Sequence, residues 1–316
     1  MAGGLTVVVV GAGSIGRRHH DNLTALSARS ELIGWRGFSV EALADRLATG
    51  ADAVVIATAT DVRLPLIAVC AGAGVPVYVE KPLAFLPSDV AAIAAIARPV
   101  ASRSMLGLMM RYHPAFRVLA AADLSDVFQF SLSIGHDVTQ WRKDWRFSQS
   151  YAARAMGGGV LLDLCHEIDM VACLFPRLSV RAVESLGHPA FPGVDMASRI
   201  NLGRAGLSGE VAMDYLTPKL HRRCILRGSE RMHDFDFATQ RYVITDGAGP
   251  VTLTKSLERN DMFLAAMRDF LALVAGNAVS DVEHLPRLDF CLPSAMLVAE
   301  AWAARHFTGQ ISKDIA

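Results

Sequence analysis

The sequence predicts an α/β Rossmann domain with a doubly wound, mostly parallel sheet at its N-terminal end. An α+β domain with a mostly antiparallel, open-faced sheet is expected to follow. Short apolar runs such as Thr6–Val10 alternate with helical stretches in the first third of the chain, which is typical of a parallel sheet buried on both faces. Beyond Ala115 the strand-like runs follow one another with few helices between them. We therefore expect a boundary near Ala115, dividing residues 1–115 from residues 116–316.

The first domain is expected to alternate strands with helices. Strands are predicted at Thr6–Val10, Glu31–Trp35, Ala53–Ala57, Val75–Val79 and Met105–Met110, and helices at Gly16–Leu26, Ser39–Ala48, Leu64–Ala73 and Pro87–Ala97. Ser39 is a residue type that caps helix N-termini, and Glu41 would place a negative charge in the first turn, where it suits the helix dipole.

The second domain is expected to be rich in strands. Alternating apolar and polar residues predict strands at Asp126–Ile134, Val180–Leu186, Ala197–Leu202, Gly209–Tyr215, Arg223–Arg227 and Tyr242–Thr245. One helix is expected directly after the glycines at 157–159, and amphipathic helices are expected at Asp261–Ala275 and Pro293–Phe307.

Composition favours a protein that binds a small molecule. The 316 residues include 31 Lys and Arg against 31 Asp and Glu, and 52% of them are hydrophobic. This balance gives no general attraction to nucleic acid or to an anionic membrane, and no apolar stretch reaches the ~18 residues of a membrane span. The five cysteines form no C-x-x-C pair, so neither a disulfide framework nor a metal site is expected. With a start that lacks signal-peptide features, these observations predict a cytoplasmic protein.

A glycine-rich loop follows the first expected strand. It reads Gly11-Ala12-Gly13-Ser14-Ile15-Gly16, a G-x-G-x-x-G motif at the start of a helix. Gly11 would make the tight turn, Gly13 would let a pyrophosphate approach the backbone, and Gly16 would let the helix pack on the strand. The helix N-terminus, with Ser14 and Ile15, would offer backbone N–H groups to the phosphates. The motif therefore predicts dinucleotide binding.

The residues that would contact the adenosine ribose favour NADP over NAD. An acidic residue about 20 positions beyond the loop normally holds the ribose of NAD, whereas this chain has Gly34-Trp35-Arg36-Gly37-Phe38-Ser39 there. Arg36 is suited to a 2′-phosphate, with Ser39 adding a hydrogen bond. The alternative is that Arg36 is only a solvent-exposed loop residue.

Four segments together resemble the glucose–fructose oxidoreductase / inositol dehydrogenase (Gfo/Idh/MocA) family. They are the glycine loop, Val79-Glu80-Lys81-Pro82-Leu83, Gly107-Leu108-Met109-Met110-Arg111-Tyr112-His113-Pro114, and the stretch from Gly157 to Asp169. The resemblance implies that Lys81 lies beside the nicotinamide and hydrogen-bonds the substrate hydroxyl, and that the Lys81–Pro82 peptide is cis. It also implies a sugar or cyclitol substrate, and places Thr58, Glu80 and Pro82 among the cofactor-binding residues.

The resemblance further implies that Asp163 and His166 act at the substrate. Oxidation of an alcohol needs a base for the hydroxyl proton, and histidine titrates near neutrality. Three positions apart on one predicted helix, the two side chains would share a face, where the carboxylate would orient the imidazole. The alternative is a polar stripe that is merely solvated. Many family members space the two residues four apart, so the identity of the principal acid/base stays open.

Two further departures from the family pattern concern the first domain. The A-T-P element with its later histidine is replaced by Ala57-Thr58-Ala59-Thr60-Asp61-Val62-Arg63. The stretch between Arg36 and Ala53 is short, so one strand and helix of the usual half are expected to be abbreviated.

Residues for the substrate are expected before the glycine run and at the end of the last parallel strand. The segment from Trp141 to Phe147, with Tyr151, mixes aromatics and cations, which suits a sugar ring with an acidic group. Arg146, Tyr151 and Arg111 are the candidate binding residues, although a solvated loop with two core tryptophans explains such a segment equally well. His19, His20 and His113 are interpreted as structural or surface residues.

These observations predict an NAD(P)-dependent oxidoreductase that acts on a hydroxyl or keto group of a sugar, sugar acid or cyclitol. One alternative is an enzyme with tightly bound NAD that oxidises its substrate transiently during glycoside cleavage or epimerisation. Another is a non-catalytic, cofactor-sensing regulator. The resemblance also implies a homodimer or homotetramer.

Overall fold

A computed structural model describes residues 4–141, 146–279 and 284–315 of the chain. The chain forms two compact units. Unit 1 consists of Met1–His113 and Leu257–Met296, and unit 2 of Pro114–Ser256 and Leu297–Ala316. The first change of unit thus falls at Pro114, whereas we expected it near Ala115. Leu257–Met296, which we had assigned to the second domain, lies in unit 1.

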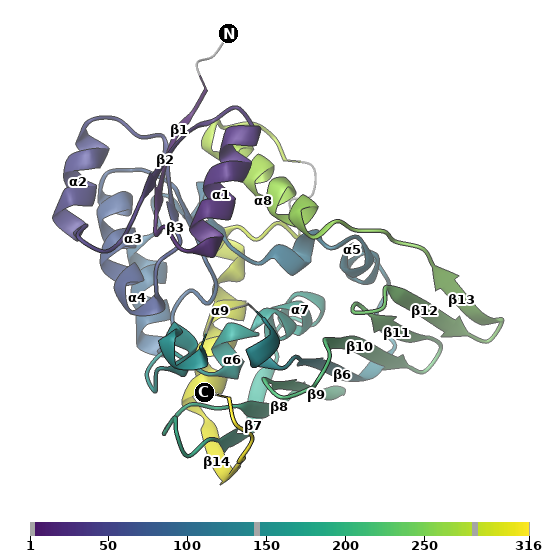
Figure 1. Ribbon diagram of the computed structural model, residues 1–316. Helices are drawn as coiled ribbons and strands as arrows, with labels where there is room; N and C mark the ends of the chain where they lie inside the picture. Colours follow the sequence, from purple (N-terminus) through teal and green to yellow (C-terminus); the bar gives the residue numbers. More distant parts are fainter. Residues whose placement is uncertain (1–3, 142–145, 280–283, 316) are drawn as a thin grey trace. The chain divides into compact units, whose positions relative to one another are not determined.

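Unit 1 is built on a five-stranded sheet in the order β2-β1-β3-β4-β5, and all neighbouring strands are parallel. Its strands are β1 (Thr6–Val10), β2 (Arg29–Ile33), β3 (Ala53–Ile56), β4 (Val77–Val79) and β5 (Met105–Leu106). Its helices are α1 (Ser14–Ala25), α2 (Val40–Ala48), α3 (Arg63–Gly72), α4 (Pro87–Ile96), α8 (Arg259–Val274) and the first part of α9 (Leu288–Ala303). Helices α1 and α8 cover one face of this sheet and α2, α3 and α4 the other (Figure 1).

Burial explains why these strands carry almost only apolar residues. The side chains of Val7 to Val10 and of Ala53 to Ile56 have no exposed surface, because helices pack against both faces of the sheet. Ser39 caps α2 as expected, since its hydroxyl accepts a hydrogen bond from the Ala42 N–H at 3.2 Å. The predicted Rossmann architecture is confirmed, although the last strand ends at Leu106 and a 3₁₀ turn, Met109–Tyr112, replaces its expected continuation.

Unit 2 contains a nine-stranded sheet in the order β13-β12-β11-β10-β6-β9-β8-β7-β14. Its strands are β6 (Val127–Gly135), β7 (Ser179–Gly187), β8 (Ala197–Arg204), β9 (Leu207–Asp214), β10 (His221–Gly228), β11 (Met232–Asp236), β12 (Arg241–Asp246), β13 (Gly249–Leu253) and β14 (Arg305–Gln310). The β6–β9 and β7–β14 pairs are parallel and the remaining pairs antiparallel. The predicted mostly antiparallel sheet is therefore confirmed.

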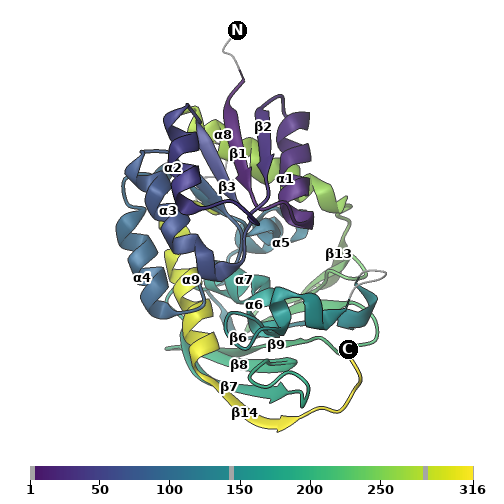
Figure 2. The same ribbon diagram turned by 60° about the vertical axis from the view of Figure 1, so that its left-hand side comes forward.

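Helices of unit 2 pack on one face of this sheet. They are α6 (Val160–Asp163) and α7 (His166–Leu174), which lie beside the sheet in Figure 2. The helix α5 (Pro114–Ala120) packs against α7. The side chains at alternate positions, such as Cys224 and Leu226 on β10, are completely buried, as the two-residue period of a strand requires.

Two sequence predictions for unit 2 are wrong. The helix expected through Phe307 ends at Ala303, because the backbone from Arg305 onward pairs with β7 as strand β14. The single helix expected to carry both Asp163 and His166 is interrupted after Asp163, where Leu164 has φ −104° and ψ 27°, and α7 begins only at His166. None of the described helices combines the length and apolar character needed to cross a membrane.

Candidate active site

The glycine loop joins β1 to α1, and two of its glycines are required by close packing. Gly11 has φ +113°, and a Cβ there would lie 2.5 Å from the Ala57 carbonyl oxygen. A Cβ at Gly16 would lie 1.7 Å from the Gly11 carbonyl oxygen. Gly13 differs, since a Cβ at this position would meet no atom within 4 Å. Packing within the protein thus explains Gly11 and Gly16 but not Gly13.

The loop fits the diphosphate of a dinucleotide. Gly13 is the N-cap of α1 and provides no side-chain cap, and the first turn of the helix holds no acidic residue. The positive end of the helix dipole, with the amides of Ser14 and Ile15, therefore lies where an anion can be held. The open space at Gly13 lets an anion approach the backbone closely.

Arg36 lies in the loop after β2, beside the glycine loop. The Gly11 N–H donates to the Ile33 carbonyl at 2.8 Å, which ties the end of β2 to this loop. The Arg36 side chain is exposed, and the rings of its neighbours Trp35 and Phe38 meet edge to face at 6.5 Å. Its position and exposure allow contact with a ribose phosphate, as predicted, and equally fit a solvated loop.

Lys81 follows β4, and its peptide bond to Pro82 is cis, as the resemblance implies. Lys81 is half-buried, whereas its neighbours Glu80 and Pro82 are buried. The Glu80 carboxylate accepts hydrogen bonds from His19 Nε2 at 2.7 Å and from the Lys81 N–H at 3.3 Å. Burial raises the pKa of Glu80, but the hydrogen bond from His19 and the nearby charges of His19, Lys81 and Arg63 outweigh burial and hold this pKa below its usual value.

An arginine that the sequence reasoning did not single out contacts the same turn. Arg63 is the first residue of α3 and is buried. Its guanidinium donates to the carbonyl oxygens of Thr58, Glu80 and Pro82. A polar residue among the apolar side chains of α3 was the only sequence signal for this role. The predicted residue Thr58 is itself buried, directly beyond β3. Arg111 is buried in the 3₁₀ turn Met109–Tyr112.

Asp163 of unit 2 is held by two tyrosines. The Tyr151 hydroxyl donates to one carboxylate oxygen at 2.5 Å, and the Tyr215 hydroxyl donates to the other at 3.0 Å. Burial, followed by the negative charge of Asp163, raises the pKa of Tyr215 well above its usual value. Tyr215 therefore stays protonated and keeps donating. Tyr151 is half-exposed, whereas Tyr215 is inaccessible.

His166 is buried at the start of α7. Because Asp163 ends one helix and His166 begins the next, the prediction that both lie on a single helix is wrong. That the carboxylate orients the imidazole remains a prediction.

The glycine run before α6 has a packing cause. Gly159 has φ +96°, and a Cβ there would lie 2.0 Å from Asp195 Oδ1. Asp195 is completely buried and accepts hydrogen bonds from the Leu161 N–H, from the Ser198 hydroxyl and from Arg305. The glycines therefore let α6 begin against a buried carboxylate.

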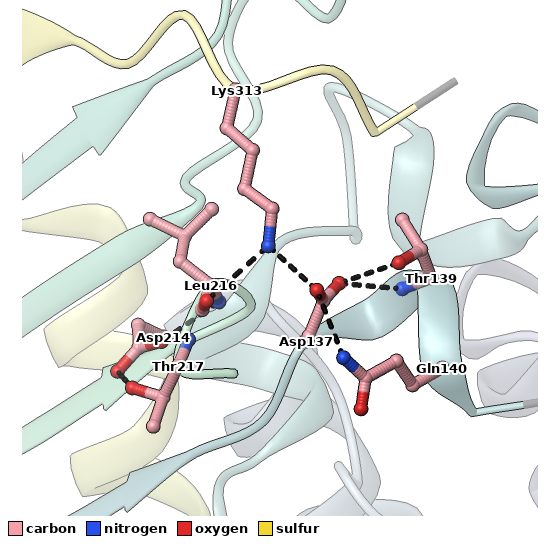
Figure 3. Close-up of polar contacts among 7 residues, drawn as sticks. All are labelled: Asp137, Thr139, Gln140, Asp214, Leu216, Thr217 and Lys313. Carbon is pink, nitrogen blue, oxygen red and sulfur yellow. Dashed lines mark hydrogen bonds and ion pairs between the residues drawn. The ribbon is translucent and has the colours of Figure 1, made fainter. Parts of the chain in front are cut away.

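A polar cluster fixes the loop that begins the predicted substrate segment. Asp137 accepts hydrogen bonds from the backbone and hydroxyl of Thr139, from Gln140, and at 2.6 Å from the Lys313 ammonium (Figure 3). Lys313 also donates to the Leu216 carbonyl at 3.4 Å. The sequence reasoning missed both Asp137 and Lys313.

The indole of Trp141 follows this loop and meets the Tyr215 ring edge to face at 5.6 Å. Arg146 is exposed just before a short 3₁₀ turn. The predicted residues Arg142 to Trp145 lie outside the described residues. Trp141, Tyr215, Tyr151 and Asp163 thus form a connected group of aromatic and acidic side chains in unit 2.

Comparisons with known proteins agree with this architecture. No protein-family model matches the chain. The 3-ketoreductase KijD10 from Actinomadura kijaniata, solved with NADP and TDP-benzene, aligns over 97% of this chain and 99% of its own with a TM-score of 0.75 and 18% identity. Levoglucosan dehydrogenase in complex with NADH aligns over 95% of this chain and 96% of its own, with a TM-score of 0.73 and 16% identity. The chain has the Gfo/Idh/MocA fold.

A sequence relative supports the same resemblance. Myo-inositol dehydrogenase Hyg17 from Streptomyces leeuwenhoekii is 29% identical over 197 residues, which is 57% of this chain. The match spans 58% of that relative's length. The resemblance to the Gfo/Idh/MocA family that the four sequence segments carry is therefore confirmed.

Proposed function

We propose that this Gfo/Idh/MocA-type protein is an NAD(P)-dependent oxidoreductase acting on a hydroxyl or keto group of a sugar, sugar acid or cyclitol. The observation that carries the proposal is the arrangement at one edge of the unit 1 sheet. The glycine loop, Thr58 and Lys81 follow β1, β3 and β4 respectively, which are neighbours in the sheet. In doubly wound sheets ligands bind at the carboxyl ends of such strands. The named relatives, two of them dehydrogenases and one a ketoreductase, support the same activity.

The residues of unit 1 would bind the cofactor and prepare the hydroxyl for oxidation. The bound nicotinamide would supply a hydride acceptor or donor. The Lys81 ammonium would donate a hydrogen bond to the reacting oxygen, lowering the pKa of the substrate hydroxyl through its positive charge. Glu80 is engaged by His19 and by the Lys81 N–H, so it serves the turn rather than the proton transfer.

The residues of unit 2 would move the proton and hold the substrate. Each oxygen of the Asp163 carboxylate already accepts a hydrogen bond from a tyrosine. We therefore assign the proton transfer to His166 and an orienting and binding role to Asp163. The aromatic face of Trp141 suits the apolar side of a sugar ring. Tyr151, Arg146 and Arg111 are the proposed additional contacts, with the two arginines suited to a carboxylate on the substrate.

The cofactor is proposed to be NADP in preference to NAD. No carboxylate stands between Gly34 and Ser39, and the exposed guanidinium of Arg36 is available to a 2′-phosphate. Titration with NADPH and NADH, followed by nicotinamide fluorescence, would compare the two Kd values. A lower Kd for NADH would contradict this preference.

Lys81→Met tests the function directly. Methionine keeps most of the side-chain volume but removes the ammonium, so turnover with sugars, sugar acids and cyclitols should fall by about 10²- to 10⁴-fold. The Kd for NADPH should change little. Turnover is followed by nicotinamide absorbance, and free NADPH accumulating in solution separates a dehydrogenase from an enzyme that oxidises its substrate only transiently. Unchanged turnover in the variant would refute the role of Lys81.

We also propose that the protein is a homodimer or homotetramer. The unit 2 sheet carries exposed apolar side chains on several strands, among them Phe128, Met232 and Val251. Exposed apolar groups of this kind favour association. Light scattering coupled to size-exclusion chromatography measures the assembly, and a monomer at micromolar concentration would contradict the proposal.

A further inference from the structure

We propose that Arg63 is a positioning residue that fixes the backbone on both sides of Lys81; this inference rests on the proposed role of Lys81. One guanidinium nitrogen, Nη1, donates to the carbonyl oxygens of Glu80 and Pro82, the residues immediately before and after Lys81. Nε and Nη2 donate to the Thr58 carbonyl at 3.2 and 2.8 Å. A single side chain thus ties the turn after β4 to the segment after β3.

The chemistry of these contacts requires arginine. The guanidinium is planar and rigid, and it presents donors in several fixed directions. Three backbone carbonyls converge on it within the protein interior, where Arg63 is only 4% exposed. A lysine at this position would bring one ammonium on a flexible stem, and it would not span carbonyls on two different segments with the same geometry.

The backbone of Lys81 is also restrained at its N–H group. The Lys81 N–H donates to the Glu80 carboxylate, whose other oxygen is bound by the buried His19. This carboxylate occupies the space beside Gly107 that a side chain would fill, because a Cβ there would lie 2.8 Å from Glu80 Oε1. The backbone of Lys81 is therefore held at its N–H and at both flanking carbonyls, while its side chain remains half-exposed.

This arrangement has a functional consequence. A catalytic group accelerates a reaction only when it is held close to its working geometry, and a displacement of about 1 Å costs on the order of 10²-fold in rate. Arg63 itself would touch neither the reacting atoms nor the cofactor. It acts through the position of Lys81.

Arg63→Lys tests the inference, with Arg103→Lys as matched control. Arg103 also donates to a backbone carbonyl, that of Gly74 at 3.0 Å, but at a distant and more exposed site. We expect Arg63→Lys to lower kcat by about 100-fold with little change in KM or in the Kd for NADPH. Arg103→Lys should leave all three quantities unchanged.

A double variant separates positioning from general stability. If Arg63 acts through Lys81, Arg63→Lys should lower kcat no further once Lys81→Met is present, since the two residues act as a unit. Additive losses would overturn the inference while leaving the proposed function intact. If Lys81→Met alone has no effect, both the function and the inference fail.

Hydrogen exchange provides a readout without turnover. In the protein without added cofactor, Arg63→Lys should speed hydrogen exchange of the Lys81 amide by about tenfold, as expected for loss of local restraint. The exchange rates of the β1 amides should stay unchanged. Unchanged exchange at Lys81 would contradict the proposal. Where Arg63→Lys yields no folded protein, Arg63→Gln, which keeps a neutral two-proton donor, is measured in the same way and judged by the same outcomes.

Discussion

The candidate site residues of the two units are held in place by different kinds of contact. In unit 1 the turn that carries Lys81 is fixed by Glu80, its immediate neighbour, and by Arg63, whose partner Glu80 lies 17 residues later. In unit 2 the loop at Asp137 is fixed by Lys313, 176 residues away, and Asp163 by Tyr215, 52 residues away. Apart from His19, which binds Glu80 from 61 residues away, the contacts at the proposed cofactor site come from nearby parts of the sequence. The proposed substrate residues depend in addition on Lys313 and Tyr215, which the fold brings from far along the chain. We therefore expect the first group to respond to changes within its motifs and the second to changes far from them.

The largest effect is expected for a substitution at Gly13, which should weaken NADPH binding without changing stability. Gly13→Ala adds a methyl group that meets no protein atom within 4 Å, so the melting temperature should be unchanged. The same methyl group would keep a diphosphate from approaching the loop, and the Kd for NADPH should rise by about 100-fold. Nicotinamide fluorescence measures this binding.

The matched control is Gly72→Ala. A Cβ at Gly72 would also meet no atom within 4 Å, but this glycine lies at the end of α3, away from the glycine loop. NADPH binding should be retained there. A Gly13→Ala protein that binds NADPH as tightly as the wild type would remove the glycine loop from the proposed site.

The substitution Tyr215→Phe, in unit 2, is expected to have an intermediate effect on kcat/KM. The variant deletes one of the two hydroxyls that hold Asp163, and the loss of one hydrogen bond to a charged group corresponds to about a tenfold decrease in kcat/KM. NADPH binding should not change, since no residue of the glycine loop is altered. Steady-state kinetics with the best substrate of the sugar panel measures the effect.

Tyr242→Phe serves as control for this change, because Tyr242 is a completely buried tyrosine of the same sheet outside the candidate site. Equal losses in the two variants would mean that the Tyr215 hydroxyl contributes to folding rather than to the position of Asp163.

The same difference between near and distant contacts explains which of these residues the sequence could predict. The glycine loop, Lys81 and the parallel strands lie within short motifs whose backbone requirements are local, so they were predictable. The contacts of Arg63 were not, because the residues around it do not reveal which carbonyls the fold brings to its guanidinium. The break between Asp163 and His166 was missed because neither Gly nor Pro marks it. Strand β14 is paired with β7, which precedes it by more than 100 residues, and the contact of Lys313 with Asp137 spans 176 residues, so neighbouring residues reveal neither.

The smallest effect is expected for Lys313→Met, which removes the most distant of these contacts. Burial raises the pKa of Asp137, but hydrogen bonds from Lys313 and Thr139 and the Lys313 charge together hold this pKa below its usual value. A carboxyl whose pKa is lower in the folded than in the unfolded protein stabilises the fold at pH values above its unfolded-state pKa. This stabilisation is lost as the pH falls through its folded-state pKa. Lys313 is 40% exposed, so the free energy of unfolding at pH 7 should fall by only about 1 kcal/mol.

Denaturant unfolding at several pH values measures this change, with Lys219→Met as a control for the loss of one exposed positive charge. The difference between wild type and Lys313→Met should shrink as the pH falls and Asp137 takes up a proton, because an uncharged carboxyl no longer attracts the ammonium. A difference that persists at low pH would mean that Lys313 stabilises unit 2 through its aliphatic stem or its bond to Leu216, and that the end of the chain holds the Asp137 loop by packing instead of charge.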